Sequence, residues 1–269
     1  MIAWLRTIAF LTIFYLGSVF IVIGVIFAAP FGERVVIRHA NTWAWFHRWV
    51  ARVVMGITTR IEGAVPPGQY LFAAKHQAMY ETLELQLILA SPAMVLKREL
   101  TRIPIWGWAT KLYGSVAVDR EASAKALRHL MTQGAELRAR GRSVIVYPEG
   151  TRVPPGETPP LRSGFAGLYK ALNLPVVPIA LDSGRLLPKK GAKRPGVVTM
   201  RIGEPIPPGL PRREAERRVW EAINALETPS RQQEGSGSVM PPAEVGGGIV
   251  LTLVDDRATD RARPGEKLE

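Results

Sequence analysis

The sequence predicts an α/β fold in which a mostly parallel sheet is flanked by helices and preceded by an N-terminal membrane-anchoring helix or hairpin. Two observations predict it. Short β-rich runs alternate with helical runs from Gly56 to Thr228, as in chains that build parallel sheets. Before them, Thr7 to Ala29 holds 23 residues without a charge. We therefore expect an anchor over residues 1–57, an α/β domain over 58–228 and a flexible C-terminal tail over 229–269.

The uncharged N-terminal run is long enough to cross a membrane. As a helix with a rise of about 1.5 Å per residue it would extend roughly 34 Å, and a hydrocarbon core measures about 30 Å. A cleaved signal peptide fits less well, because its apolar region usually has about 7 to 15 residues and because Pro30 directly follows Ala28-Ala29. One arginine precedes the run and several closely follow it, so the positive-inside rule predicts the cytoplasmic (inner) membrane, with the body in the cytoplasm.

A second helix is predicted over Trp43–Met55, capped by Asn41-Thr42. It mixes tryptophans with His47, Arg48 and Arg52, which suits the headgroup layer of a membrane or a packed surface of the domain. The two N-terminal elements are compatible with a single span and with a re-entrant hairpin.

The body is predicted to contain seven strands and five helices. The strands are expected at Thr58–Glu62, Tyr70–Ala74, Met94–Lys97, Ser115–Val118, Ser143–Tyr147, Val176–Leu181 and Val197–Ile202. The helices are expected at Tyr80–Ala90, Pro104–Tyr113, Ala122–Arg140, Gly164–Leu172 and Arg212–Leu226.

The net charge of +12 is uneven, because residues 229–269 carry five basic and seven acidic side chains and the rest therefore carries +14. A basic body suits nucleic acid, an anionic membrane, or a phosphorylated or coenzyme A-like substrate. The basic residues are dispersed and no nucleic-acid recognition motif occurs, so we expect no nucleic acid partner. Cysteine is absent, which excludes disulfides, thiolate metal sites and a cysteine nucleophile.

His76 is the candidate general base, because it follows a predicted strand and precedes a predicted helix. On one continuous helix, residues 76 and 81 would lie about 140° apart. With His76 on the loop and Glu81 in the first helical turn, the carboxylate could fix the imidazole tautomer and prepare the ring to accept a proton.

The run Tyr147-Pro148-Glu149-Gly150-Thr151-Arg152 follows a buried strand, at the edge of the sheet where open α/β folds bind ligands. Gly150 permits a tight turn, Arg152 offers planar donors for a phosphate, and Glu149 could orient that arginine or hold a polar headgroup. Lys97 and Arg120 follow two other strands and could meet an anionic substrate.

Four blocks in this order resemble the 1-acyl-glycerol-3-phosphate acyltransferases of the glycerolipid acyltransferase family. They are His76–Glu81, Gly114–Arg120, Tyr147–Arg152 and Val177–Ile179. The resemblance covers roughly residues 70 to 182 and implies a glycerolipid acyltransferase-like fold, with a catalytic domain over 58–228.

The resemblance also implies a membrane-bound enzyme of phospholipid biosynthesis that makes phosphatidic acid. An acyl chain would pass from acyl-CoA or acyl carrier protein, which are substrates rather than cofactors, to the hydroxyl of a lysophospholipid. His76 would be the base and Glu81 would orient it. Glu149, Gly150, Thr151 and Arg152 would bind the glycerol phosphate, and Arg120 would support that site, beside the candidate Lys97. The charge of +14 on the body would also favour anionic membrane lipids. No metal is implied.

Three departures from the family pattern leave the acceptor open. Glu81 replaces the usual aspartate, Lys75 the common asparagine, and Ala78 a serine. Lyso-ornithine lipid or another lysolipid is an alternative acceptor, and a non-catalytic lipid-binding membrane protein is an alternative function.

Overall fold

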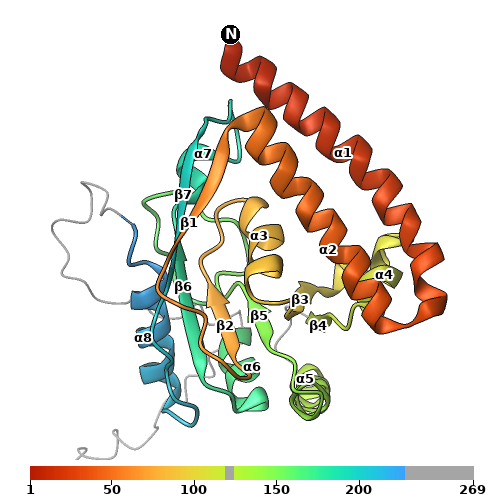
Figure 1. The fold of residues 1–269 in the computed structure, drawn as a ribbon. Coiled ribbons are helices and arrows are strands. Elements are labelled where there is room, and N and C mark those ends of the chain that lie inside the picture. Colours follow the sequence, from red (N-terminus) through yellow and green to blue (C-terminus); the bar gives the residue numbers. More distant parts are fainter. Residues whose placement is uncertain (119–123, 228–269) are drawn as a thin grey trace, which may run out of the picture.

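A computed structural model describes residues 1–118 and 124–227 (Figure 1). The predicted tail lies outside the described residues. The centre of the fold is a seven-stranded sheet with the order β1-β7-β6-β2-β5-β3-β4. Its strands are β1 (Ile57–Glu62), β2 (Leu71–Ala74), β3 (Ala93–Lys97), β4 (Val116–Val118), β5 (Val144–Val146), β6 (Val176–Leu181) and β7 (Gly196–Ile202).

The sheet is mostly parallel, as predicted. In the described part of the chain, five strand pairs are parallel, and the pair β6–β7 is antiparallel. Every predicted strand is present, with its ends within one residue of the expected positions. Because β2, β5 and β3 run in the same direction, the residues that follow them lie at one edge of the sheet.

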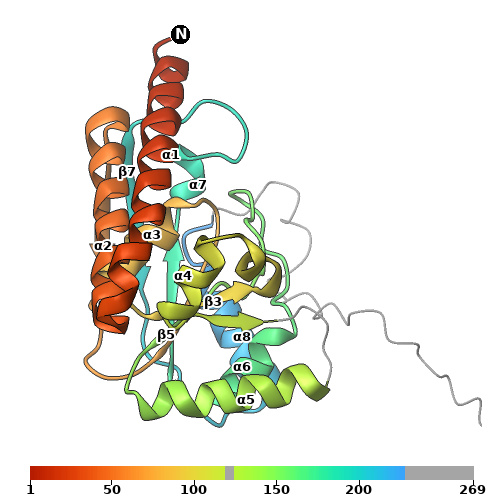
Figure 2. The same ribbon diagram turned by 90° about the vertical axis from the view of Figure 1, so that its right-hand side faces the viewer.

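Helices cover both faces of the sheet, so the strands are apolar on both sides. On one face, Leu71 and Val144 pack against α5 (Ala124–Ala139), α6 (Gly164–Leu172) and α8 (Arg212–Ile223). On the other face, Phe72 and Ile145 pack towards α3 (Tyr80–Ile88) and the N-terminal helices (Figures 1 and 2). The remaining short helices are α4 (Trp106–Leu112) and α7 (Ser183–Leu186), with 3₁₀ turns at Ala29–Phe31 and Arg98–Arg102.

The N-terminal segment forms a helical hairpin of α1 (Ile2–Ala28) and α2 (Glu33–Val50), extended by a π-helical turn at Ala51–Met55. The predicted helix start at Asn41-Thr42 is therefore wrong. The turn lies instead around Pro30 and Gly32, where the positive φ of Gly32 reverses the chain. Asn41 is held by tertiary contacts, because its amide oxygen accepts a hydrogen bond from Gln86 at 2.9 Å.

The hairpin packs tightly against itself and is attached to the domain along α1. The indole of Trp43 donates to the hydroxyl of Ser18 at 2.8 Å, and Phe14 stacks on Trp43. The backbone N–H of Lys193 donates to the Thr7 hydroxyl at 2.9 Å, and Val25 packs near Tyr113 at the other end of the helix. The two predicted N-terminal elements thus form a helical hairpin, and its arrangement in a membrane stays a prediction.

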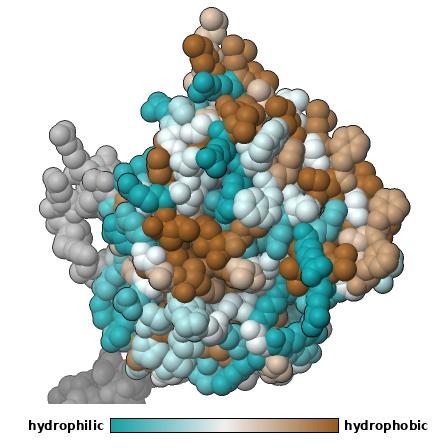
Figure 3. Space-filling view, in the orientation of Figure 1, coloured by the Kyte–Doolittle hydropathy of each residue, from teal (hydrophilic) through white to brown (hydrophobic). Residues whose placement is uncertain are grey.

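The outer side of the hairpin is apolar and exposed (Figure 3). Ile2–Phe31 is long and apolar enough to cross a membrane, and 22% of its most apolar window is buried in the protein. Large exposed side chains on this side include Leu5, Ile8, Leu16, Phe20, Phe27, Trp45 and Trp49. Such a surface is typical of a protein that meets a membrane or a partner.

Candidate active site

His76 and Glu81 are brought together at the carboxyl edge of the sheet. His76 follows β2, and Glu81 lies in the first turn of α3. The Nδ1 atom of His76 lies 3.0 Å from the Glu81 Oε1 atom. Among the described residues, none hydrogen-bonds the other ring nitrogen, Nε2, and the side chain of His76 is 17% exposed. This geometry leaves Nε2 to accept a proton from a ligand.

Glu81 is fully buried and held by four donors. Besides His76, the backbone N–H groups of Gln77 and Ala78 donate to Oε1, each at 2.7 Å. The hydroxyl of Ser183 donates to Oε2 at 2.8 Å. These contacts fix the carboxylate, which in turn fixes the imidazole. Ser183 lies on α7, about a hundred residues further along the chain, and the sequence carries no signal for its role.

A second buried carboxylate, Glu149, supports the main chain of His76. Its Oε2 atom accepts the backbone N–H of His76 at 3.0 Å, and its Oε1 atom lies 2.7 Å from Lys75 Nζ. Burial raises the pKa of Glu149, and the ammonium of Lys75 opposes that rise. Both oxygens are used within the protein, so this geometry favours a supporting role for Glu149. A direct substrate contact stays a prediction.

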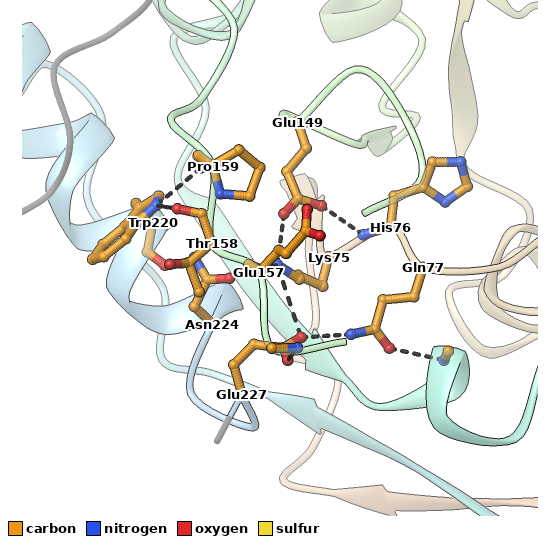
Figure 4. A network of polar contacts seen from close by, with 12 residues as sticks. Lys75, His76, Gln77, Glu149, Glu157, Thr158, Pro159, Trp220, Asn224 and Glu227 are labelled. Carbon is orange, nitrogen blue, oxygen red and sulfur yellow. Dashed lines mark hydrogen bonds and ion pairs between the residues drawn. The ribbon is translucent and has the colours of Figure 1, made fainter. Parts of the chain in front are cut away.

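Lys75 occupies the centre of this network (Figure 4). Its buried ammonium also donates to the Glu157 carbonyl and to the Asn224 side chain, each at 2.7 Å, and Glu227 lies 3.8 Å away. All three ammonium protons therefore have acceptors. The network joins β2, two loops and the end of α8, and the imidazole of His76 points away from it. The sequence marks Lys75 only as a departure from the family pattern.

The ring of Tyr147 lies against His76, with the ring centroids 4.4 Å apart. Its hydroxyl is buried and has no hydrogen-bond partner among the described residues. Burial, together with the negative charge of Glu81, raises the pKa of Tyr147 well above its usual value. The side chain therefore stays a neutral phenol beside the candidate base.

The remaining predicted site residues lie at the same edge of the sheet. Gly150 has a positive φ of 68°, which explains why glycine suits this turn, and Thr151 and Arg152 are exposed. Lys97 ends β3, which is separated from β2 by β5. Arg120 lies outside the described residues. The substrate-binding roles of these residues stay predictions.

An apolar cavity lies between the hairpin and the domain. Its lining includes Val25, Val36, Trp43, Met94, Trp106 and Tyr113. The lining residues come from α1 and α2 of the hairpin and from α3, β3 and α4 of the domain. An alkyl chain would fit such a lining by its chemistry.

Comparisons with known proteins agree with the motifs. Residues 56–182 match the family model described as Acyltransferase, which confirms the predicted family resemblance. The 1-acyl-sn-glycerol-3-phosphate acyltransferase of Pseudomonas aeruginosa is 38% identical over 166 residues, which cover 61% of this chain and 65% of that protein. The Saccharomyces cerevisiae protein of the same name is 26% identical over 212 residues, with 72% and 69% covered.

The fold also has a solved counterpart. The crystal structure of the 1-acyl-sn-glycerophosphate (LPA) acyltransferase PlsC from Thermotoga maritima aligns with a TM-score of 0.65 at 22% identity. The alignment covers 83% of this chain and 97% of that one. The predicted fold class is thereby confirmed.

Proposed function

We propose that this protein is a membrane-associated O-acyltransferase. It transfers a fatty acyl chain from acyl-CoA or acyl carrier protein to the free hydroxyl of 1-acyl-glycerol-3-phosphate, giving phosphatidic acid. The observation that carries the proposal is the His76–Glu81 pair, whose Nε2 faces no described partner, in a domain that matches the acyltransferase family. The names of the relatives support the choice of acceptor.

The reaction needs one base and no covalent enzyme intermediate. Nε2 of His76 takes the proton from the acceptor hydroxyl as its oxygen attacks the thioester carbonyl. The tetrahedral intermediate collapses, the carbon–sulfur bond breaks, and the departing thiolate takes the proton from the imidazolium. Glu81 holds Nδ1–H throughout and stabilises the transient positive charge of the ring.

The acceptor is held by its phosphate and its acyl chain. In this proposal Arg152 and Thr151 meet the phosphate, with Lys97 and Arg120 contributing positive charge from neighbouring strand ends. The apolar cavity under the hairpin supplies a place for an acyl chain. Anionic membrane lipids are further proposed partners of the basic surface.

In this proposal the hairpin holds the site near the membrane surface. Contacts at Thr7 and Val25 hold both halves of α1 against the domain. These contacts would have to break for α1 to span the bilayer. We infer that the exposed side of the hairpin enters one leaflet of the cytoplasmic membrane, with the domain in the cytoplasm.

The test is turnover by the purified protein with lysophosphatidic acid and each acyl donor. The His76→Ala variant should lose at least about a thousandfold in kcat, because general base catalysis and the oriented dyad are both removed. Lys170→Ala, an exposed change on α6, is the control and should retain full turnover. Full turnover by His76→Ala would remove His76 from the mechanism, and a panel including lyso-ornithine lipid identifies the acceptor.

A further inference from the structure

A groove begins beside the candidate base and leads to a cluster of cations. Gln77, which directly follows His76, lines it together with Arg152. Pro188, Lys189 and Lys190, from the loop after α7, line it as well. The sequence carries no motif that indicates a role for this loop.

Among the described residues, the cations of this groove and the nearby Lys193 have no carboxylate partner, unlike several other cations of the protein. Arg48 pairs with Glu84, Arg142 with Glu33, and Arg201 with Glu62. Within residues 1–118 and 124–227, by contrast, no carboxylate forms an ion pair with Arg152, Lys189, Lys190 or Lys193.

Lys193 is close enough to Arg152 to feel its charge. Burial lowers the pKa of Lys193, and repulsion from the Arg152 guanidinium lowers it further. Like charges held near one another without a carboxylate repel, and a bound anion would relieve that repulsion.

The loop is fixed relative to the His76–Glu81 pair. The N–H of Lys193 donates to Thr7 on α1 at 2.9 Å, and the N–H of Arg194 donates to the Leu186 carbonyl at 2.9 Å. In α7, Ser183 binds Glu81, and the N–H of Gly184 donates to the Gln77 side chain at 2.8 Å. The cations are thus attached to a framework that includes the candidate catalytic residues.

We propose that Lys189, Lys190 and Lys193 form a phosphate-binding site for the acyl donor, and that coenzyme A is the group bound there. This inference rests on the proposed function. The acceptor carries a single phosphate, for which Arg152 is already the predicted ligand, and the further cations exceed what that phosphate needs. Coenzyme A carries a diphosphate and a ribose phosphate, joined to its thiol by a long, narrow arm. With the phosphates at the lysines, the arm would extend along the groove towards Gln77, the neighbour of His76.

The test compares the Michaelis constants of the two substrates in detergent micelles. The variant Lys189→Ala/Lys190→Ala should raise KM for acyl-CoA by about five- to tenfold, as expected for the loss of two solvent-screened contacts. KM for lysophosphatidic acid and kcat at saturating donor should change less than twofold. The control Lys170→Ala/Arg213→Ala removes the same charge from the distant helices α6 and α8, and should leave both constants unchanged.

Calorimetric titration with free coenzyme A supplies a readout without turnover. Wild-type protein should bind it more tightly than Lys189→Ala/Lys190→Ala by the same factor, and more tightly than it binds 3′-dephospho-coenzyme A. If this holds and no acyl transfer occurs, the site stands and the proposed function fails.

Four results would overturn the site. The first is a rise in KM for lysophosphatidic acid alone, which assigns the cluster to the acceptor. The second is weaker binding to vesicles containing phosphatidylglycerol with unchanged KM values, which assigns it to the lipid surface. The third is turnover with acyl carrier protein as the sole donor. The fourth is a Lys189→Ala/Lys190→Ala variant with unchanged KM values, coenzyme A binding and vesicle binding, which would show that these lysines contact only solvent.

Discussion

The ammonium of Lys75 lies 2.7 Å from the Glu149 carboxylate, and neither side chain is exposed to solvent. Because the other oxygen of Glu149 accepts the N–H of His76, the ion pair also supports the main chain of the candidate base. Lys75 stands where the resembled family commonly has asparagine. In this chain a buried positive charge therefore holds the Glu149 carboxylate that supports the main chain of His76. Burying two charges is costly, and the remaining hydrogen bonds of Lys75 compensate for it.

The costs of removing the two partners of this pair should not be additive. Lys75→Met should lower the free energy of unfolding by about 3 to 5 kcal/mol, because it leaves the Glu149 carboxylate buried without a counter-charge. Lys75→Met/Glu149→Gln should cost less than the sum of the single changes by more than about 1 kcal/mol. Denaturant unfolding in micelles gives these values.

The exposed pair Arg201–Glu62, at 2.8 Å, is the matched control for that cycle. Arg201→Met/Glu62→Gln should show a coupling energy below about 1 kcal/mol, because water screens the pair. Simple additivity at Lys75 and Glu149 would contradict the account of a mutually dependent buried pair.

The Tyr147 hydroxyl should prove dispensable for stability. It is buried without a partner among the described residues, and an unsatisfied buried hydroxyl costs about 1 to 3 kcal/mol. Tyr147→Phe should therefore raise the free energy of unfolding by about 1 kcal/mol and leave kcat within twofold. Tyr113→Phe is the control and should destabilise, because its buried hydroxyl donates to the Pro92 carbonyl at 3.0 Å. A large fall in kcat for Tyr147→Phe would mean that the hydroxyl contacts a ligand.

The strands were predictable because their signal is local. Each buried parallel strand is a short apolar run bounded by glycine, proline or polar residues, so even the antiparallel β6 and β7 appear at the expected positions. The start of α2 was not predictable in this way. Asn41-Thr42 has the chemistry of a cap, but the contact of Asn41 with Gln86, far along the chain, keeps it inside the helix.

In the candidate site, too, the local contacts were predictable from the sequence and the distant contacts were not. The approach of His76 and Glu81 follows from one loop and one helical turn, and sequence spacing predicts it. Contacts from α7 and the end of α8 complete the site, through Ser183, Asn224 and Glu227. No short sequence motif predicts contacts between residues so far apart in the chain. Glu149 illustrates both cases, because its position after β5 was predicted and its burial against Lys75 was not.

The stability of the hairpin should depend on pH through His47. This side chain is 1% exposed, lies among Phe10, Phe14 and Tyr80, and has its Nδ1 atom unpartnered among the described residues. Burial, with a smaller contribution from Arg48, lowers the pKa of His47 from 6.5 to about 4.

Between pH 6.5 and 4 the unfolded chain therefore binds the proton that folded His47 excludes, so stability falls as the pH falls. The loss should reach on the order of 3 kcal/mol at the acid end of this window. Denaturant unfolding at several pH values should show that His47→Leu removes this contribution. Parallel pH profiles for wild type and His47→Leu would show that His47 does not titrate in this way.

The close approach of α1 and α2 depends on Gly17. A Cβ atom there would lie 2.4 Å from the ring of Phe46, and that ring is stacked against Phe14 and Trp49. Gly17→Leu must therefore displace Phe46 or separate the helices, and overpacking of this kind costs about 1 to 3 kcal/mol. The greater helix propensity of leucine opposes part of that cost, by less than about 1 kcal/mol.

We expect Gly17→Leu to lower the thermal unfolding midpoint in micelles and to speed proteolysis near the turn at Gly32. Val19→Leu is the matched control, because it adds bulk to the exposed side of the same helix, where no protein atom need move. Since the hairpin also closes the apolar cavity beneath it, Gly17→Leu should weaken use of the lipid substrate more than Val19→Leu does. Equal stability of the two variants would show that the helices adjust without cost and that Gly17 does not set their separation.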